Sequence, residues 1–314
     1  MAIKVFIDGA AGTTGLEIRQ RLAGRSEVAL AALNEAQRKD ASARAAMLNE
    51  SDIVILCLPD DAAREAVAMI ENPNVRVIDS STAHRTAKGW VYGFPEMEPG
   101  QRGAIGTAKR LSNPGCYSTG FIALVRPLVR STLLPADWPV TVNAVSGYSG
   151  GGRNMIAEFE DKGAPNNVVV RTYDLSLDHK HVEEMRVHAG LTHRPLFAPS
   201  VGRFYRGMLV DVPLQLWALP GRPKIFDLHA VLAESYKGEP LVDVAPLAET
   251  AEMKTLNAEE LKNTNRMKIY VFSNKAHEQA RVVAVLDNLG KGAAGAAVQN
   301  LNVMMGWPET QGLV

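Results

Sequence analysis

Three evenly spaced glycines, Gly9, Gly12 and Gly15, stand between an apolar run at residues 3–7 and a helical pattern at residues 16–22. The apolar run has the length and composition of a buried strand. A strand, a glycine turn and a helix in this order form the start of a dinucleotide-binding sheet, in which backbone N–H groups approach a pyrophosphate at the helix N-terminus. This feature therefore favours a fold in which strands alternate with helices.

Further apolar runs at residues 28–33, 52–58 and 75–79 read as strands, and residues 61–70 read as a helix. Continuous apolar strands separated by helices predict a parallel sheet covered on both faces. The spacing G-x-x-G-x-x-G departs from the commoner G-x-G-x-x-G, so the glycines alone also suit a plain tight turn. Their setting favours a cofactor site. We expect it to include Gly9, Gly12, Thr13, Thr14, Gly15, Ser80 and Ser81.

The residues after the second predicted strand bear on the choice between NAD and NADP. An NAD site usually has an acidic residue about 20 positions after the glycines, where it binds the ribose hydroxyls. Glu35 stands there, while Arg38 and Lys39 follow and could pair with a 2′-phosphate. The spacing favours NADP and Arg38 without excluding NAD.

The pattern changes after residue 115. Residues 140–145, 168–173, 207–216 and 267–272 read as longer strands, and residues 178–189 and 226–236 read as helices. Many strands with few helices predict an α+β domain. We therefore predict a Rossmann-type NADP-binding α/β domain at residues 1–115 and an α+β catalytic and oligomerisation domain at residues 116–290. The Ala- and Gly-rich end, residues 291–314, is predicted to form a helix that completes the first domain.

Charge and composition exclude several classes of protein. The 314 residues contain 34 Lys and Arg against 34 Asp and Glu. A nucleic-acid-binding protein normally has a basic excess. No apolar run approaches the ~18 residues of a membrane span, and no leader pattern precedes residue 3. The two cysteines suit a reducing compartment. We expect a cytoplasmic protein that binds neither nucleic acid nor membrane.

Cys116 is the candidate nucleophile. It follows Pro114-Gly115 and precedes an apolar, helix-like run at residues 121–129. A cysteine near the first turn of a helix lies beside unpaired N–H groups that favour a thiolate. Cys57 lies within an apolar strand and reads as a small buried residue. Beside a nicotinamide site, a nucleophilic thiol predicts hydride transfer that links an acyl phosphate to an aldehyde through a thioester.

Such chemistry needs a base, and His179 and His181 are the best candidates. Two residues apart at a predicted helix start, they point in different directions, so we expect one of them to serve Cys116. The pattern does not decide which. No grouping of Cys, His and Asp has metal-ligand spacing, and we predict no metal. Asn113 and three arginines beside serine or glycine, Arg85, Arg153 and Arg206, are candidates for binding a doubly anionic substrate.

These segments resemble the N-acetyl-γ-glutamyl-phosphate reductase family of arginine biosynthesis, in its shorter form. The resemblance runs nearly end to end and is carried by six segments of the sequence. They are residues 9–15 (cofactor loop), 92–96 (Y-G-x-P-E), 113–117 (N-P-G-C-Y), 147–153 (S-G-x-S-G-x-G-R), 180–185 (R-H-x-P-E-I) and 197–208 (F-x-P…R-G-I). Residues 287–295 resemble a D-N-L-x-K-G-A-A-G segment that aspartate-semialdehyde dehydrogenases share.

The resemblance implies particular roles. Cys116 would be the nucleophile and His181 the acid–base group, with His179 as the alternative because Glu183 replaces a family proline. Ser118 likewise replaces a proline after N-P-G-C-Y. The family implies NADP and a homo-oligomer, usually a tetramer. The expected reaction is the NADPH-dependent reduction of N-acetyl-γ-glutamyl phosphate to the γ-semialdehyde.

Two alternatives are weighed against that reaction. One is another acyl-phosphate reductase, either aspartate-semialdehyde dehydrogenase or an aminoadipyl-phosphate reductase. The other is a non-catalytic NADP-binding regulator, which would have no need for a cysteine at a helix start near a histidine-bearing helix.

Overall fold

The computed structural model describes residues 2–34, 36–161 and 168–313. The chain divides into two compact units. The first contains Met1–Pro95, Gly100–Pro114 and Ala293–Val314, and the second contains Glu96–Pro99 and Gly115–Gly292. The chain therefore passes from one unit to the other after residues 95, 99, 114 and 292.

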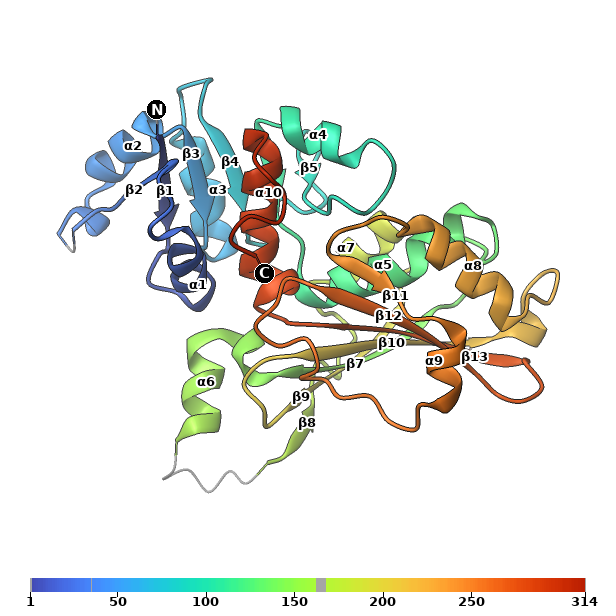
Figure 1. Ribbon diagram of the computed structural model, residues 1–314. Helices are drawn as coiled ribbons and strands as arrows, with labels where there is room; N and C mark the ends of the chain where they lie inside the picture. Colours follow the sequence, from blue (N-terminus) through green and yellow to red (C-terminus); the bar gives the residue numbers. More distant parts are fainter. Residues whose placement is uncertain (1, 35, 162–167, 314) are drawn as a thin grey trace. The chain divides into compact units, whose positions relative to one another are not determined.

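The first unit is built on a six-stranded sheet in the order β2-β1-β3-β4-β6-β5, in which every neighbouring pair is parallel. Each residue of β3 is buried, as expected of a strand covered on both faces. The parallel sheet predicted from the apolar runs is confirmed (Figure 1). The strands are β1 (Ile3–Asp8), β2 (Val28–Ala31), β3 (Ile53–Leu56), β4 (Arg76–Asp79), β5 (Val91–Tyr92) and β6 (Arg110–Ser112).

Helices cover this sheet, and the C-terminal helix is one of them, packed against α1, α4 and β4. The sequence analysis did not predict α2, which has one buried residue, Leu48, and so lacks a clear apolar stripe. The Asp40 carboxylate caps α2 by accepting from the backbone N–H groups of Ser42 and Ala43. The helices are α1 (Thr13–Leu22), α2 (Ala41–Glu50), α3 (Asp60–Ala68), α4 (Gln101–Thr107) and α10 (Gly295–Met305), with a 3-10 turn at Gln37–Lys39.

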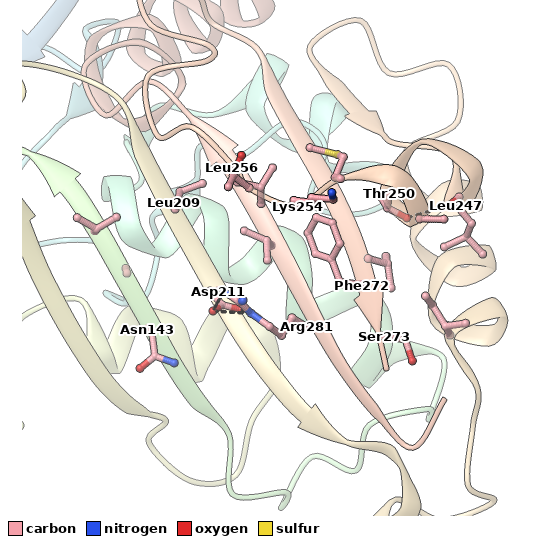
Figure 2. Close-up of a pocket in the computed structure, with 18 of the residues that line it drawn as sticks. Asn143, Leu209, Asp211, Leu247, Thr250, Lys254, Leu256, Phe272, Ser273 and Arg281 are labelled. Carbon is pink, nitrogen blue, oxygen red and sulfur yellow. Dashed lines mark hydrogen bonds and ion pairs between the residues drawn. The ribbon is translucent and has the colours of Figure 1, made fainter. Parts of the chain in front are cut away.

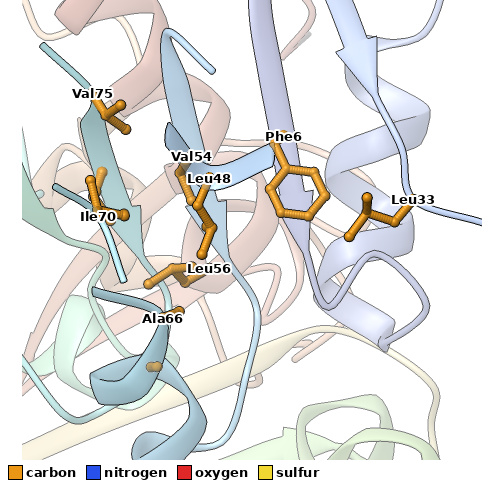
Figure 3. Packing of buried hydrophobic residues seen from close by; sticks show 10 residues of the cluster. Phe6, Leu33, Leu48, Val54, Leu56, Ala66, Ile70 and Val75 are labelled. Atoms are coloured by element: carbon orange, nitrogen blue, oxygen red, sulfur yellow. The ribbon is translucent and has the colours of Figure 1, made fainter. Parts of the chain in front are cut away.

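The core of the first unit lies between the strands and the helices α2 and α3 (Figure 3). Phe6 of β1, Val54 and Leu56 of β3, Leu48 of α2 and Ala66 of α3 belong to one buried cluster. These side chains come from segments that alternate along the chain, so burial of the cluster requires the strands and helices to form together.

The second unit contains a seven-stranded mixed sheet in the order β11-β12-β13-β10-β7-β9-β8. The predicted strands correspond to β7, β8, β10 and β12, and the α+β architecture is confirmed. No strand was predicted at β9, whose Pro199 weakens a strand pattern, at the short β11 or at β13. The strands are β7 (Thr141–Gly147), β8 (Val170–Thr172), β9 (Leu196–Gly202), β10 (Met208–Gln215), β11 (Val242–Val244), β12 (Met267–Ser273) and β13 (Gln279–Leu286).

Helix α5 is the central helix of the second unit and packs against β10, β13, α7 and α8. Every residue from Tyr117 to Val125 is buried. Other helical segments of this unit are α6 (Gly152–Glu160), α7 (Val182–Ala189), α8 (Ile225–Ser235) and α9 (Leu247–Glu252), with α5 itself spanning Cys116–Arg130. Shorter turns are 3-10 at Tyr148–Gly151 and Leu216–Ala218 and π at Gly290–Ala294.

The predicted start of α7 at residue 178 is wrong, because the helix begins at Val182. Leu177 has a φ of +61°, which interrupts helical geometry just before this segment. The His179 ring then accepts a hydrogen bond from the His181 backbone N–H through Nδ1 at 3.1 Å. A side chain that bonds nearby backbone in this way competes with the helix. As a result, His181 occupies the N-cap position and His179 lies before the helix.

Across the described ranges, no helix combines the length and apolar character that crossing a membrane requires.

Candidate active site

The predicted glycine turn joins β1 to α1, and its three glycines serve different purposes. Gly9 has a φ of +88°, and a Cβ there would lie 2.3 Å from the Cys57 carbonyl oxygen. A Cβ on Gly15 would lie 2.5 Å from the Gly9 carbonyl oxygen. The fold itself therefore requires these two glycines. Gly12 is the N-cap of α1, and a Cβ there would make an ordinary 3.4 Å contact, so its lack of a side chain suits a ligand at the helix start.

A cavity of about 560 Å³ lies beside this turn within the first unit. Gly9, Ala10 and Ala11 line it together with Arg38 and Arg44. Its volume and its backbone-lined, basic walls fit the adenosine end of a dinucleotide that carries a 2′-phosphate. Glu35, the alternative that would favour NAD, lies outside the described residues.

Two of the arginines that line this cavity, Arg38 and Arg44, are held differently. Arg44 Nε donates to Asp8 Oδ2 at 2.7 Å, and both side chains are largely buried. Arg38 is exposed, and its Nε donates to the Leu33 carbonyl oxygen at 3.2 Å. Sequence reasoning named Arg38 and missed Arg44, which lies in the helix that the apolar pattern did not predict.

The predicted residues Ser80 and Ser81 follow β4 in a loop organised by Asp79. Asp79 is fully buried, and its carboxylate accepts from the Ser81 N–H and Oγ at 2.9 and 2.7 Å. His84 Nδ1 lies 2.6 Å from the same carboxylate. The Ser81 hydroxyl is therefore used by the loop, and the Ser80 hydroxyl oxygen is also buried. Burial also raises the pKa of the nearby Cys57 thiol to about 12, as expected of a structural cysteine.

Asn113 and Arg85 meet in the first unit. Arg85 is buried, and its guanidinium donates to the carbonyl oxygens of Asn113 and Ser80 at 3.1 Å each. The Asn113 amide accepts from Asn300 at 3.0 Å and donates to the Ala293 carbonyl at 2.9 Å. These contacts fix the segment that leads into the cysteine.

Cys116 is the first residue of α5 and is partly exposed. Its helix N-cap is Gly115, whose backbone N–H donates to Glu184 Oε1 at 2.8 Å. Glu184 lies in α7 and is 2% exposed. A buried carboxylate thus fastens the start of the cysteine helix to the helix whose N-cap is His181.

Tyr117, the residue after the cysteine, packs against both candidate bases. Its ring centroid is 5.9 Å from that of His179 and 5.9 Å from that of His181. The two histidine rings are themselves 4.7 Å apart in an edge-to-face arrangement. His181 is 6% exposed, whereas His179 is more accessible. The structure therefore brings the nucleophile's helix start and both predicted bases into one cluster.

Tyr173 completes this cluster, and sequence reasoning did not find it. Its hydroxyl donates to the Tyr117 hydroxyl at 3.0 Å, and Tyr117 donates to the Ser200 carbonyl oxygen at 3.3 Å. Burial raises the pKa of both tyrosines well above their usual value, and the negative charge of a Cys116 thiolate raises them further. Both hydroxyls are therefore protonated donors beside the cysteine.

The predicted arginines Arg153, in the first turn of α6, and Arg206, in the loop before β10, belong to two segments that are bonded to each other in the second unit. The Gly207 N–H donates to Asn288 Oδ1 at 2.8 Å, and Asn288 Nδ2 donates to Ser149 Oγ at 2.9 Å. Asn288 therefore ties the segment before Arg153 to the segment that follows Arg206. Sequence reasoning quoted the motif that contains Asn288 but gave that residue no role.

The two arginines differ in exposure. Arg153 is exposed in the first turn of α6. Arg206 Nε lies 3.4 Å from Oδ2 of the fully buried Asp287, and its Nη1 donates to Asn263 Oδ1 at 2.6 Å. Arg206 is thus held in one orientation by a buried carboxylate, while the charge of Arg153 faces solvent.

A second cavity, of about 960 Å³, lies on the sheet of the second unit (Figure 2). Its lining includes Asn143, Leu209, Phe272 and the ion pair of Asp211 with Arg281, but no predicted site residue. It is therefore separate from the cysteine cluster. Among the described residues, no group of three or more His, Cys, Asp or Glu side chains is arranged to hold a metal.

Comparisons with known proteins agree with this arrangement. Residues 4–104 match the family model of the semialdehyde dehydrogenase NAD binding domain, and residues 116–288 match that of the semialdehyde dehydrogenase dimerisation domain. The chain is 51% identical over 318 residues to N-acetyl-gamma-glutamyl-phosphate reductase 2 of Nostoc sp., covering 99% of both chains. The chain belongs to the N-acetyl-γ-glutamyl-phosphate reductases of the semialdehyde dehydrogenase family.

Another relative supports this membership, and solved structures support the fold. The N-acetyl-gamma-glutamyl-phosphate reductase of Brucella suis is 53% identical over 309 residues, which cover 98% of this chain and all of that protein. Aspartate semialdehyde dehydrogenase II of Vibrio cholerae aligns with a TM-score of 0.70 at 13% identity, covering 97% and 98% of the two chains. The Candida albicans enzyme, solved with NADP, has a TM-score of 0.64 at 13% identity, covering 97% and 99%.

Proposed function

We propose that this chain reduces N-acetyl-γ-glutamyl phosphate to N-acetylglutamate γ-semialdehyde and phosphate, with NADPH as the reductant. The names of its relatives state this activity for them. The observation that carries the proposal is the setting of Cys116. It begins α5, its preceding residue is fastened to α7, and its following residue packs against both candidate histidines.

The predicted domain of residues 1–115 with 291–314, which contains most of the first unit, is proposed to bind the cofactor. Gly12, Thr13 and Thr14 would present backbone N–H groups to the pyrophosphate at the start of α1. Arg38 and Arg44, which line the adjacent cavity, would pair with the 2′-phosphate and favour NADP over NAD. When bound, the reduced cofactor supplies a hydride.

The predicted domain of residues 116–290, which contains most of the second unit, is proposed to carry the covalent chemistry. The Cys116 thiolate attacks the γ-carbonyl carbon, a C–S bond forms, and the C–O bond to phosphate breaks, which leaves a thioester. Hydride addition to the thioester carbonyl gives a thiohemiacetal. Cleavage of its C–S bond then releases the aldehyde and regenerates the thiolate.

His181 is proposed as the acid–base group. It takes the thiol proton before attack and moves a proton at the thiohemiacetal oxygen. Its position at the N-cap of α7, a helix bonded to Gly115 through Glu184, favours it over His179. His179 bonds the His181 backbone through Nδ1 and is assigned the positioning role.

Arg153 and Arg206 are proposed to bind the anionic groups of the substrate, because their segments are joined by Asn288. Asn113 and Arg85 are proposed to act by holding the segment that precedes the cysteine.

The proposal includes a homo-oligomer, with a tetramer as the specific form. Exposed apolar side chains line the sheet-face cavity of the second unit, among them Phe226 at 62% and Val170 at 60% exposure. A second copy covering this face would remove them from water.

Neither cysteine forms a disulfide, which supports the cytoplasm as the compartment of action.

The test runs the reaction in reverse. Purified protein is mixed with NADP, phosphate and N-acetylglutamate γ-semialdehyde, and the appearance of NADPH is followed by absorbance. We expect the reduction of NADP to require phosphate and to be faster with this aldehyde than with aspartate semialdehyde. A preference for aspartate semialdehyde would overturn the substrate assignment. Phosphate-independent reduction would overturn the acyl-phosphate chemistry.

A further inference from the structure

A buried ion pair in the second unit joins two segments that have no role in the proposed reaction so far. Lys291 Nζ lies 2.6 Å from Glu96 Oε1, and the side chains are 1% and 0% exposed. Glu96 belongs to the short segment Glu96–Pro99, while Lys291 is the second residue of the π-helical turn Gly290–Ala294. The pair therefore fixes this turn to a segment 195 residues away in the sequence.

Stability alone is a weak reason for such a pair. Removing two charges from water costs about as much as their attraction returns, and well-packed apolar side chains of similar volume often stabilise a protein equally or better. What the charges provide is a defined geometry, because the attraction between two buried opposite charges depends strongly on their separation.

The π-helical turn packs directly on the nucleophile. A Cβ on Gly292 would lie 2.7 Å from the Cys116 Cβ and 3.2 Å from its Cα. The same turn is fixed at its start by Asp287, whose carboxylate accepts from the Leu289 and Gly290 N–H groups at 2.8 and 3.0 Å. Single π-helical turns often occur at functional sites.

We infer that Glu96 and Lys291 are positioning residues for Cys116. Their ion pair holds the π-helical turn so that Gly292 stays against the backbone and Cβ of the cysteine. This contact limits the directions in which the thiol can move and keeps it aimed at its substrate. The inference rests on the proposed function for the role of Cys116 as nucleophile.

The same short segment contains a matched control. Glu98 pairs with Arg126 of α5, and these side chains are 34% and 20% exposed. Arg126 Nη1 also donates to the His188 carbonyl oxygen at 2.7 Å. Glu98→Gln therefore removes an ion pair from the same segment without touching the turn at Cys116.

The experiment compares Lys291→Met, the double variant Glu96→Met with Lys291→Met, and Glu98→Gln. Thermal unfolding identifies the folded variants. Steady-state kinetics separate kcat from KM, and NADP affinity is measured by fluorescence titration. The pH profile of Cys116 alkylation by iodoacetamide, with the labelled peptide identified by mass spectrometry, reports on the thiol without any substrate.

We expect the double variant to fold, with an alkylation profile displaced along the pH axis. Its kcat should fall at least about tenfold, as a misplaced reacting group requires, while NADP affinity stays unchanged. Lys291→Met should lose as much kcat and also stability, because it leaves the Glu96 charge buried. Glu98→Gln should stay within about twofold of wild type, because a partly exposed pair contributes little.

A folded double variant with wild-type kcat and alkylation profile would overturn the inference. If the double variant does not fold, Glu96→Asp is measured instead, because it keeps the charge and shortens the side chain. A wild-type alkylation profile and kcat in Glu96→Asp would then overturn the inference. If the wild-type protein does not reduce the acyl phosphate but the variants still shift the pH profile of Cys116 alkylation, the proposed function is wrong. The positioning role of Glu96 and Lys291 is then still supported.

Discussion

Helices α1 and α5 both begin after a glycine, and the N–H groups at their starts have different surroundings. Gly12 is the N-cap of α1 and Gly115 is the N-cap of α5, and neither provides a side chain to cap its helix. At α5 the protein's own carboxylate, Glu184, accepts from the Gly115 N–H. At α1 the turn borders a cavity. One helix start is shaped for a ligand, while the other is held in place to present a thiol.

The largest effect is expected from a substitution that removes the thiol at the start of α5. Cys116→Ala should lower kcat by at least about 10³-fold, since a covalent route is lost. NADP affinity and the thermal unfolding midpoint should stay near wild type, because Cys116 is partly exposed and belongs to the second unit. Steady-state kinetics and cofactor titration measure these outcomes. Substantial activity in Cys116→Ala would contradict the thioester route.

The second test separates the two histidines of the same cluster. His181→Asn should lower kcat about 10²-fold or more, which is the usual contribution of a general acid–base group. His179→Asn should cost about tenfold, as expected for loss of the positioning bond to the His181 N–H. The kcat–pH profile should lose one limb in His181→Asn and keep it in His179→Asn. The reverse pattern would assign the base to His179.

The third test addresses the fastening of α5 to α7. Glu184→Ala leaves the buried Gly115 N–H without its carboxylate, which should cost about 1–3 kcal/mol of folding free energy. Glu184→Gln keeps an oxygen acceptor at that place and should cost less. Denaturant unfolding measures both variants. If the two were equally stable, the bond to Gly115 would not be what fastens the helices.

The fourth test compares two glycines at the α1 start. Gly9→Ala would place a Cβ 2.3 Å from the Cys57 carbonyl oxygen at a φ of +88°, so we expect it to destabilise the first unit by roughly 3 kcal/mol. Gly12→Ala should fold within about 1 kcal/mol of wild type and weaken NADP binding about tenfold, because its Cβ faces the ligand side. Equal NADP affinity in wild type and Gly12→Ala would argue against the pyrophosphate at this turn.

The smallest expected effect concerns pH and the second cysteine. Folding raises the pKa of Cys57 from 9.0 to about 12 through burial. As the pH rises, the thiol of the unfolded chain therefore ionises before that of the folded protein. The contribution of the protonated Cys57 thiol to the folding free energy is fully present below pH 9 and is lost as the pH rises toward 12. At pH 8.5 we expect iodoacetamide to label Cys116 and to spare Cys57. Faster labelling of Cys57 than of Cys116 in the folded protein would contradict the raised pKa of the Cys57 thiol.

Local patterns predicted the elements that rest on local causes. The apolar runs predicted the parallel sheet because its strands are buried on both faces and read as continuous hydrophobic segments. The Pro-Gly pair and the apolar run after it placed Cys116 at a helix start, where α5 begins. Patterns failed where a tertiary contact replaced a local signal, as in α2 with its single buried leucine and in β9 with its Pro199.

The two kinds of unit, the glycine turn and the place of Cys116 at a helix start could be predicted from the sequence, because each depends on residues that are neighbours in the chain. Which side chains support Cys116 depends instead on tertiary contacts. Glu184 reaches Gly115 across 69 residues, and Lys291 reaches Glu96 across 195. No spacing or periodicity encodes such pairs, because they depend on how the folded segments meet. The start of α7 at Val182 likewise depends on the hydrogen bond from the His181 N–H to the His179 ring, which a helical pattern in the sequence does not reveal.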